Sequence, residues 1–227
     1  MAKENIHAIR RKRIRAKRKN QLLYWGIAVA VALAIYIPIR VFLFKPYLVA
    51  TNSMANTLKK GDVVLTKVVN DPRFLEIGDI VVFTYPPEPS QYRFGRIAAI
   101  GPAHIQIYNK RLFVNREEVS PAPQVWFSDP ELDDEPNSLR DNFGPFTLSP
   151  GHLFILGDNR DLANDSRNWG ELPPDNVLGK PMFIYFRWKP DPRAPEVNGP
   201  LDLLNAFFYN LFNIPNRADL SRIGGVE

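Results

Sequence analysis

The feature that most constrains this chain is a long uncharged apolar run directly behind a strongly basic tail. Residues 22–39 (LLYWGIAVAVALAIYIPI) contain no charged side chain, and as a helix this run crosses most of a bilayer core about 30 Å thick. Residues 1–20 hold nine of the 29 Lys and Arg residues and one of the 24 Asp and Glu residues. Because basic residues stay on the cytoplasmic side, the pattern predicts a cytoplasmic tail over 1–20, a transmembrane helix over 21–44 and an extracytoplasmic remainder.

A cleavable signal peptide and a nucleic-acid-binding tail explain this N-terminal segment less well than a membrane anchor does. A cleavable signal peptide needs small residues after its apolar run, whereas the alanines between Ala28 and Ala34 lie inside the run. A nucleic-acid-binding tail is also disfavoured, because a basic run directly beside an apolar span is explained more simply by membrane topology. Without the tail the chain has 20 basic and 23 acidic residues, so no basic patch is expected on the folded body. The basicity therefore belongs to the tail alone. We expect an uncleaved anchor in a phospholipid membrane and no nucleic-acid partner.

The scarcity of metal-binding side chains limits the possible chemistry. The chain has no cysteine, which excludes disulfides, thiolate metal sites and a cysteine nucleophile. Its three histidines, His7, His104 and His152, are scattered along the sequence and do not have the spacing of a zinc site. The sequence therefore predicts no metal and no cofactor.

The region behind the apolar run has the pattern of a β domain. Its β-branched and aromatic segments are separated by turn-forming residues; they are 63–69, 79–86, 96–101, 104–115, 152–158 and 179–188. Within the fourth segment, Asn109 and Lys110 are predicted to form a hairpin turn. Residues 116–150 are rich in Pro, Asp, Glu and Asn and are predicted to be a surface excursion. The sequence thus predicts a mainly β protein, with an exported antiparallel domain over 45–190.

The C-terminal extension, 191–227, contains a segment with helical periodicity at 201–214. Its apolar side chains fall on one face of a helix; they are Leu203, Leu204, Phe207, Phe208, Leu211 and Phe212. This amphipathic helix either packs on the β domain or makes a second contact with the membrane surface. The sequence leaves both alternatives open.

A dense cluster of opposite charges lies at 157–170, GDNRDLANDSRNWG. Five charged residues fall within ten positions there: Asp158, Arg160, Asp161, Asp165 and Arg167. Such a cluster is costly to bury unless its charges pair and form hydrogen bonds. Because it follows the apolar strand HLFIL, we expect a rigid polar support that positions another part of the site.

These segments together resemble bacterial type I signal peptidases, which are membrane-anchored serine endopeptidases that release exported preproteins. The resemblance covers about residues 22–190 and rests on the apolar run followed by NSMANTLKKGD, GDIVVFTYP, RIAAIG and GDNRD with NDSR and WG. It implies that Ser53 occupies the nucleophile position and that Thr51 contributes its hydroxyl to the oxyanion hole. Asn52 and Asn56 depart from the glycine and proline of the family pattern.

The resemblance also implies further site residues. Met54 and Phe83 are predicted to contact the bound signal peptide. The structural support of the site is predicted to comprise Arg96, Asp158, Asn159, Arg160, Asp161, Asp165, Ser166 and Arg167.

The general base of the family pattern is missing. A serine hydroxyl needs an adjacent base in order to act as a nucleophile. In this family the base is a desolvated lysine that lies directly before an arginine in the sequence. Arg96 matches the arginine, so the lysine position is Gly95. Arg93 lies on the same predicted strand face, but a guanidinium stays protonated. The serine that orients the lysine amine is replaced as well, at Leu162–Ala163. These two linked losses favour a catalytically degenerate protein.

No other residue takes the lysine's place in the alignment. Four lysines and two histidines elsewhere in the chain do not match this position. They are Lys59, Lys60, Lys67, Lys110, His104 and His152. Whether the protein is an enzyme is left open by the sequence.

Three functions therefore stay open. The first is a degenerate family member that binds the signal peptides of exported preproteins at the outer face of the cytoplasmic membrane. The second is an active signal peptidase whose base comes from another residue or chain. The third is a structural component of an export or envelope complex. The expected partners are signal peptides, the membrane, and export machinery or an active paralogue.

Overall fold

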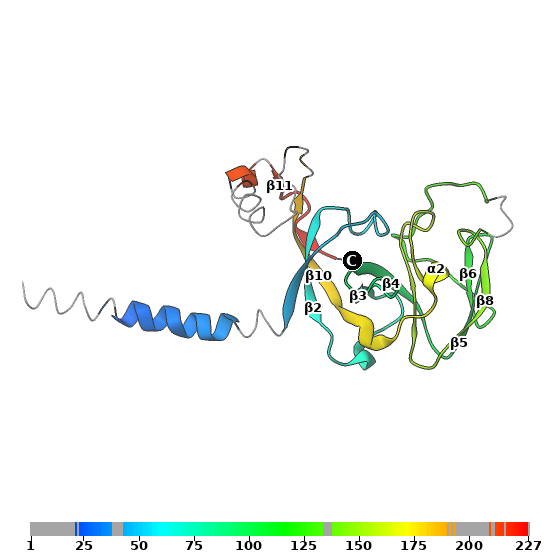
Figure 1. Cartoon of the computed structure of the whole chain (residues 1–227), viewed down its shortest axis with the longest axis horizontal. Coiled ribbons are helices and arrows are strands. Elements are labelled where there is room, and N and C mark those ends of the chain that lie inside the picture. The colour runs from blue at the N-terminus through cyan, green and yellow to red at the C-terminus, as the bar shows by residue number, and fades with distance from the viewer. Residues whose placement is uncertain are drawn as a thin grey trace, which may run out of the picture. The chain divides into compact units, whose positions relative to one another are not determined.

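The computed structural model describes residues 21, 23–37, 43–133, 138–189, 191, 193, 209, 212–215 and 217–226 (Figure 1). The chain divides into two compact units, residues 1–44 and 45–227. In the first unit, residues 23–37 form an exposed helix within the predicted transmembrane segment. No helix in the described part of the chain is both long and apolar enough to cross a membrane. The basic tail and residues 22 and 38–42 of the predicted span lie outside the described residues.

The second unit is built on a large antiparallel sheet, as predicted. Among the described residues this main sheet has eight strands, with six of them in the order β1-β2-β10-β3-β4-β9. Their bounds are β1 (Phe44–Leu48), β2 (Asp62–Val68), β3 (Ile80–Thr84), β4 (Tyr92–Ile100), β9 (Leu153–Leu156) and β10 (Val177–Trp188). The long strand β10 pairs with β2 along most of its length and with β3 at its start.

The C-terminal end of the chain returns to this sheet. Two short strands, β11 (Ala218–Asp219) and β12 (Gly224–Gly225), pair with β10. Between them, Arg222 donates to the buried carboxylate of Asp62 at 3.0 Å, and to the carbonyl of Thr57 at 3.1 Å. The C-terminal segment thereby holds the turn that leads into β2.

A second sheet in the same unit has the strand order β7-β6-β5-β8 (Figure 1). Its strands are β5 (Ala103–Tyr108), β6 (Arg111–Val114), β7 (Glu117–Val119) and β8 (Phe143–Leu148). Asn109 and Lys110 connect β5 to β6 with φ angles of 48° and 65°, the left-handed conformation of a type I′ turn. The predicted hairpin is therefore confirmed.

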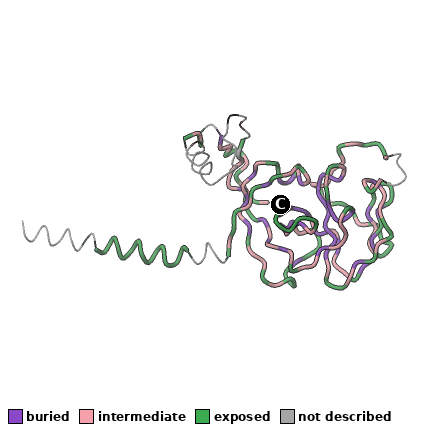
Figure 2. The backbone as a smooth tube through the Cα atoms, viewed as in Figure 1, coloured by how far each residue is buried: buried purple, intermediate pink, exposed green. Residues whose placement is uncertain are grey.

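Three buried clusters form the core of this unit, where Figure 2 shows most of the buried chain. The first cluster includes Met54 and Leu58 from the loop between β1 and β2. The second contains Phe83 and Ile155, and the third packs β5 against the ends of β4 and β9. Because alternate residues of a strand point to one face, β5 buries Ala103, Ile105 and Ile107 and exposes the residues between them.

The predicted surface excursion at 116–150 is wrong in part. Strands β7 and β8 both lie in it, and they escaped prediction because β7 has three residues and β8 has a Gly–Pro pair in its sequence, FGPFTL. Short helical segments described in the β unit include η1 (Pro72–Phe74), α2 (Ser166–Trp169) and η2 (Pro174–Asn176). Most of the predicted amphipathic helix at 201–214 lies outside the described residues, although residues 209 and 212–215 are helical.

Candidate active site

Ser53 lies in a tight turn between β1 and β2. The backbone N–H of Ala55 donates to the carbonyl of Asn52 at 3.1 Å, and that of Leu58 donates to Met54 at 2.6 Å. The side chains of Met54 and Leu58 are buried in the first cluster, so they anchor the turn to the core. Ser53 is half-buried, and the Thr51 hydroxyl donates to the Ser53 hydroxyl at 3.4 Å.

The acidic and basic loop at 157–170 packs directly on this turn. The carbonyl of Ser53 accepts the backbone N–H of Asn159 at 2.9 Å. The backbone N–H of Asp158 donates to the Sδ atom of Met54 at 3.3 Å, and the hydroxyl of Thr57 donates to the Asp158 carboxylate. The position of Ser53 is therefore fixed by residues about a hundred positions further along the chain.

A buried ion pair connects this loop to β4. The guanidinium of Arg96 makes two hydrogen bonds to Asp158, at 2.8 and 2.7 Å, and a third to the carbonyl of Gly78. The Asp158 side chain is 0% exposed. A bidentate Arg–carboxylate contact is a strong form of charged hydrogen bond. Here it fixes the loop to β4, the strand that carries Gly95.

The charges that follow Asp158 are paired in the same way. Asp165 accepts the Nε–H of Arg167 at 2.8 Å and the backbone N–H of Gly157 at 3.1 Å. Ser166 accepts the backbone N–H of Ile155 through its hydroxyl. These contacts close the loop around α2 and attach it to β9.

Asp161 attaches the loop to the second sheet through the hairpin residue Lys110. The Nζ atom of Lys110 lies 3.3 Å from Asp161 and 3.6 Å from Asp141, and it donates to the carbonyl of Asp129. The sequence did not indicate this cluster, and Lys110 was predicted only as a turn residue. Its three partners come from segments far apart in the sequence, so no local pattern pointed to it.

The space for a side chain at Gly95 is filled. Gly95 is buried in β4, opposite Val81 of β3, and a Cβ atom built on it would overlap the Cγ2 methyl of Ile155. The same Cβ atom would lie 3.4 Å from the ring of Phe83. The position that the family pattern gives to its lysine is therefore a glycine, and an apolar methyl group lies where a side chain would begin.

Ala163 lies beside the Ser53 turn. A Cβ atom built on Gly157 would overlap the Cβ of Ala163 and would lie 2.7 Å from the carbonyl of Ser53. The structure therefore brings together the position of the missing orienting hydroxyl and the main chain of Ser53.

Three of the other lysines are not placed as bases. Lys59, Lys60 and Lys67 are exposed, and desolvation is what would make a lysine a neutral amine at pH 7. His104 contacts Thr147, and His152 lies 3.9 Å from Glu171. Among the described residues, no group of three or more acidic, His or Cys side chains is placed to hold a metal ion.

The two predicted peptide contacts are both in the core. Met54 is 1% exposed and Phe83 is 2% exposed, and Phe83 packs against the ring of Trp169. These two side chains hold the site together from inside, and neither offers a surface to a peptide in this conformation.

The edge of β1 beside Ser53 carries an unforeseen contact. Val49 exchanges main-chain hydrogen bonds with Asp62 and Gly61 on the side of β2, so the main chain of Leu48 faces away from β2. Its N–H donates to the hydroxyl of Tyr92 at 3.2 Å, and its carbonyl accepts from that hydroxyl at 3.1 Å. The Tyr92 side chain therefore bridges from β4 to β1.

Comparison with known proteins shows the family of this chain. A family model described as "Signal peptidase, peptidase S26" matches residues 22–188. The Bacillus subtilis (strain 168) protein Signal peptidase I T is 34% identical over 172 residues, covering 75% of this chain and 88% of its own length. Because the family model spans most of the chain, the chain belongs to the signal peptidase family, peptidase S26, which confirms the resemblance seen in the sequence.

Two further proteins are similar. Signal peptidase I of Pseudomonas fluorescens is 29% identical over 220 residues, covering 78% of this chain and 76% of its own length. A crystal structure of a signal peptidase I from Enterococcus faecalis V583 overlaps with a TM-score of 0.37 and 21% identity, covering 47% of this chain and 95% of that chain.

Proposed function

We propose that this protein binds the signal peptides of exported preproteins as extended strands beside Ser53 and does not cleave them at an enzymatic rate. The observation that carries the proposal is the filled base position, where Ile155 occupies the space of a side chain at Gly95. Ser53 and Thr51 keep the hydroxyls of a nucleophile and an oxyanion donor. Where the chain is described, no side chain is placed as a base for this nucleophile, so general-base assistance worth about 10²- to 10⁴-fold is lost.

Two other functions remain as alternatives to this proposal. An active signal peptidase would need a base from another chain or from a rearrangement that buries Lys59, Lys60 or Lys67, which are exposed. A structural component of an export or envelope complex would use the fold as a platform and would bind no signal peptide. Peptide capture separates this third function from the first.

An added peptide strand has main-chain partners on two facing strands. Among the described residues no strand pairs with the outer edge of β1 at Leu48, where the Tyr92 hydroxyl bonds the main chain instead. Strand β9 pairs with β4 only from Arg96 onward, so in the described part of the chain Tyr92–Gly95 has no paired strand on that edge. Strand addition uses such edges for main-chain hydrogen bonds. Strands in a sheet lie about 4.8 Å apart, and the Tyr92 ring now extends across the gap between these two edges. A peptide must displace the Tyr92 hydroxyl from Leu48 in order to pair there.

Replacing Tyr92 by Phe is therefore expected to strengthen peptide capture. The change keeps the ring and removes two hydrogen bonds, each worth about 1 kcal/mol net, so capture should rise several-fold. The measurement is photo-crosslinking of a radiolabelled preprotein from a probe at Leu48, a side chain that is 45% exposed. The matched control carries the same probe at Phe74, which is 71% exposed in η1. Equal capture from the two positions, or no capture from Leu48, would favour the platform function.

We place the protein in the cytoplasmic membrane as a single-pass protein, with residues 1–20 cytoplasmic and the β domain outside. The support is the basic tail beside the uncharged run 22–39. Protease added to spheroplasts is expected to digest residues from about 47 onward and to leave only a short N-terminal fragment, detected by a tag at residue 1. A β domain that survives until the membrane is lysed would reverse the proposed orientation.

A further inference from the structure

A cavity of about 460 Å³ lies next to β4, between the main sheet and the β5–β6 hairpin. Its walls are mostly apolar and come from several segments; they include Ile77, Ile97, Leu112, Val119, Ala122 and Phe127. No residue of the Ser53 turn lines it. The cavity is thus separate from the Ser53 turn, although Arg96, Lys110 and Arg160, which belong to the contacts around the loop at 157–170, also line it.

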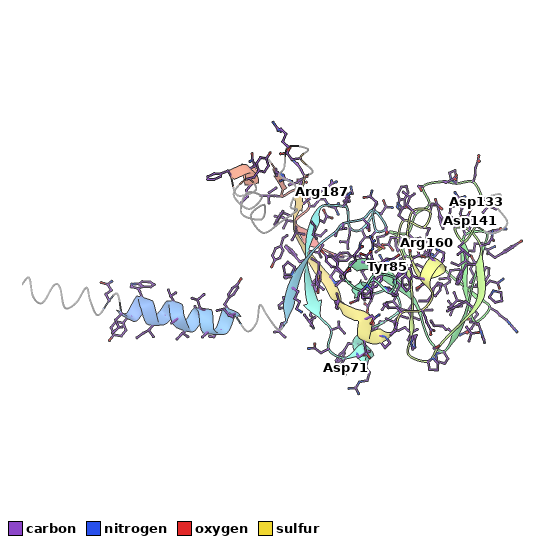
Figure 3. The ribbon with its side chains drawn as sticks, in the orientation of Figure 1. Asp71, Tyr85, Asp133, Asp141, Arg160 and Arg187 are labelled. Atoms are coloured by element: carbon purple, nitrogen blue, oxygen red, sulfur yellow. The ribbon has the colours of Figure 1, made fainter. Side chains whose placement is uncertain are left out.

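Arg160 brings a buried charge to the wall of this cavity. The residue lines the cavity and is 8% exposed, and Figure 3 shows it in the half of the β domain that holds α2. Within the described residues its Nε atom has no hydrogen-bond partner. Burial lowers the pKa of its guanidinium to about 10, so the residue is still a cation at neutral pH.

The carboxylates nearest to Arg160 in the sequence are all engaged by other cations. Asp158 accepts two hydrogen bonds from Arg96, Asp165 pairs with Arg167, and Asp161 pairs with Lys110. The other cations of the cavity wall are paired too, since Arg111 forms an ion pair with Glu118 at the rim. Among the described residues of the wall, Arg160 is therefore the cation whose guanidinium has no carboxylate within ion-pair distance, although Asp165 and Asp158 attract it from further away.

We propose that this cavity binds a carboxylate carried on an apolar body, with the carboxylate accepting hydrogen bonds from Arg160. A buried charge without a partner is strongly disfavoured, and a carboxylate is the planar acceptor that fits a guanidinium best. Apolar walls around a few convergent polar groups are the usual composition of a small-molecule site. The same chemistry is offered by a fatty acid and by the free C-terminus of an apolar peptide. The inference is independent of whether Ser53 cleaves anything.

The test uses the full-length protein in detergent and follows the arginine Nε–H signals by NMR. The Arg160 signal is the one that disappears in Arg160→Gln. Hexanoate is expected to shift it saturably, hexanol and hexylammonium should leave it unchanged, and acetate should bind at least about ten-fold more weakly because it lacks the apolar body. An acetylated Ala-Leu-Ala peptide with a free carboxylate, compared with its amide, separates the peptide source from the fatty-acid source.

Two further variants keep the test decisive if Arg160→Gln does not fold. Ala122→Leu fills the apolar wall and is expected to weaken hexanoate binding at least ten-fold, while the NMR spectrum stays that of a folded protein. Arg73→Gln, in η1 and outside the cavity wall, should leave binding unchanged. No saturable shift from either carboxylate, an equal shift from hexanol, or binding unaffected by Ala122→Leu would overturn the proposal.

Discussion

Gly95→Lys alone is expected to leave signal-peptide cleavage at background, whereas Gly95→Lys with Ala163→Ser and Ile155→Ala should raise it by about 10²-fold or more. The magnitude is the usual contribution of a general base. The new lysine cannot extend toward Ser53 while the Ile155 methyl occupies the space of its Cβ atom. It also lacks an orienting hydroxyl while residue 163 is alanine. Each single change therefore removes one obstacle and leaves the others.

A thermodynamic cycle on the same variants tests the steric conflict between residues 95 and 155. Ile155→Ala alone should cost about 2–5 kcal/mol of unfolding free energy, because it leaves a cavity in the core. Gly95→Lys alone should also destabilise, through overpacking. The double variant should be more stable than the sum of the two single costs implies, since each change relieves the other. Strict additivity in urea unfolding would show that the two side chains do not compete for space.

The second large effect is expected at the buried ion pair. Asp158→Asn should lower the free energy of unfolding by about 3–5 kcal/mol, because it leaves the Arg96 charge buried without its carboxylate. The same change removes an acceptor of the Thr57 hydroxyl, so the Ser53 turn should loosen as well. Urea unfolding of the two proteins gives the difference directly.

The matched control for Asp158→Asn is Glu118→Gln. Glu118 pairs with Arg111 on the surface, where the two side chains are 42% and 62% exposed. An exposed pair contributes about 1 kcal/mol or less, so the control should be nearly neutral. A loss at Asp158 no larger than the loss at Glu118 would contradict the structural role given to the Asp158–Arg96 pair.

Much of the fold could be predicted because it depends on local patterns. The segments rich in β-branched and aromatic residues became β2, β3, β9 and β10, and Asn109–Lys110 formed the predicted turn. Strands β1, β7 and β8 were not predicted. Each is short or interrupted by proline, and it is held by its neighbours in the sheet more than by its own composition.

The candidate site was predicted less completely, because its contacts join distant segments. The sequence indicated that the charges at 157–170 must pair, but the partner of Asp158 is 62 positions away in β4, and the partner of Asp161 is in a hairpin of the other sheet. The methyl group of Ile155 at Gly95 and the Tyr92 bridge to Leu48 depend on strand register. One residue of register decides which side chain faces which, and no spacing in the sequence fixes it.

The most direct test of the central claim is the rate at which the purified, unmodified protein cleaves a good signal-peptide substrate, compared with its Ser53→Ala variant. Ser53 has no base among the described residues around it, and the base position is filled by Ile155. The two rates are therefore predicted to be indistinguishable from each other. Robust cleavage by the unmodified protein that Ser53→Ala abolishes would contradict this claim and would show that another group supplies the base.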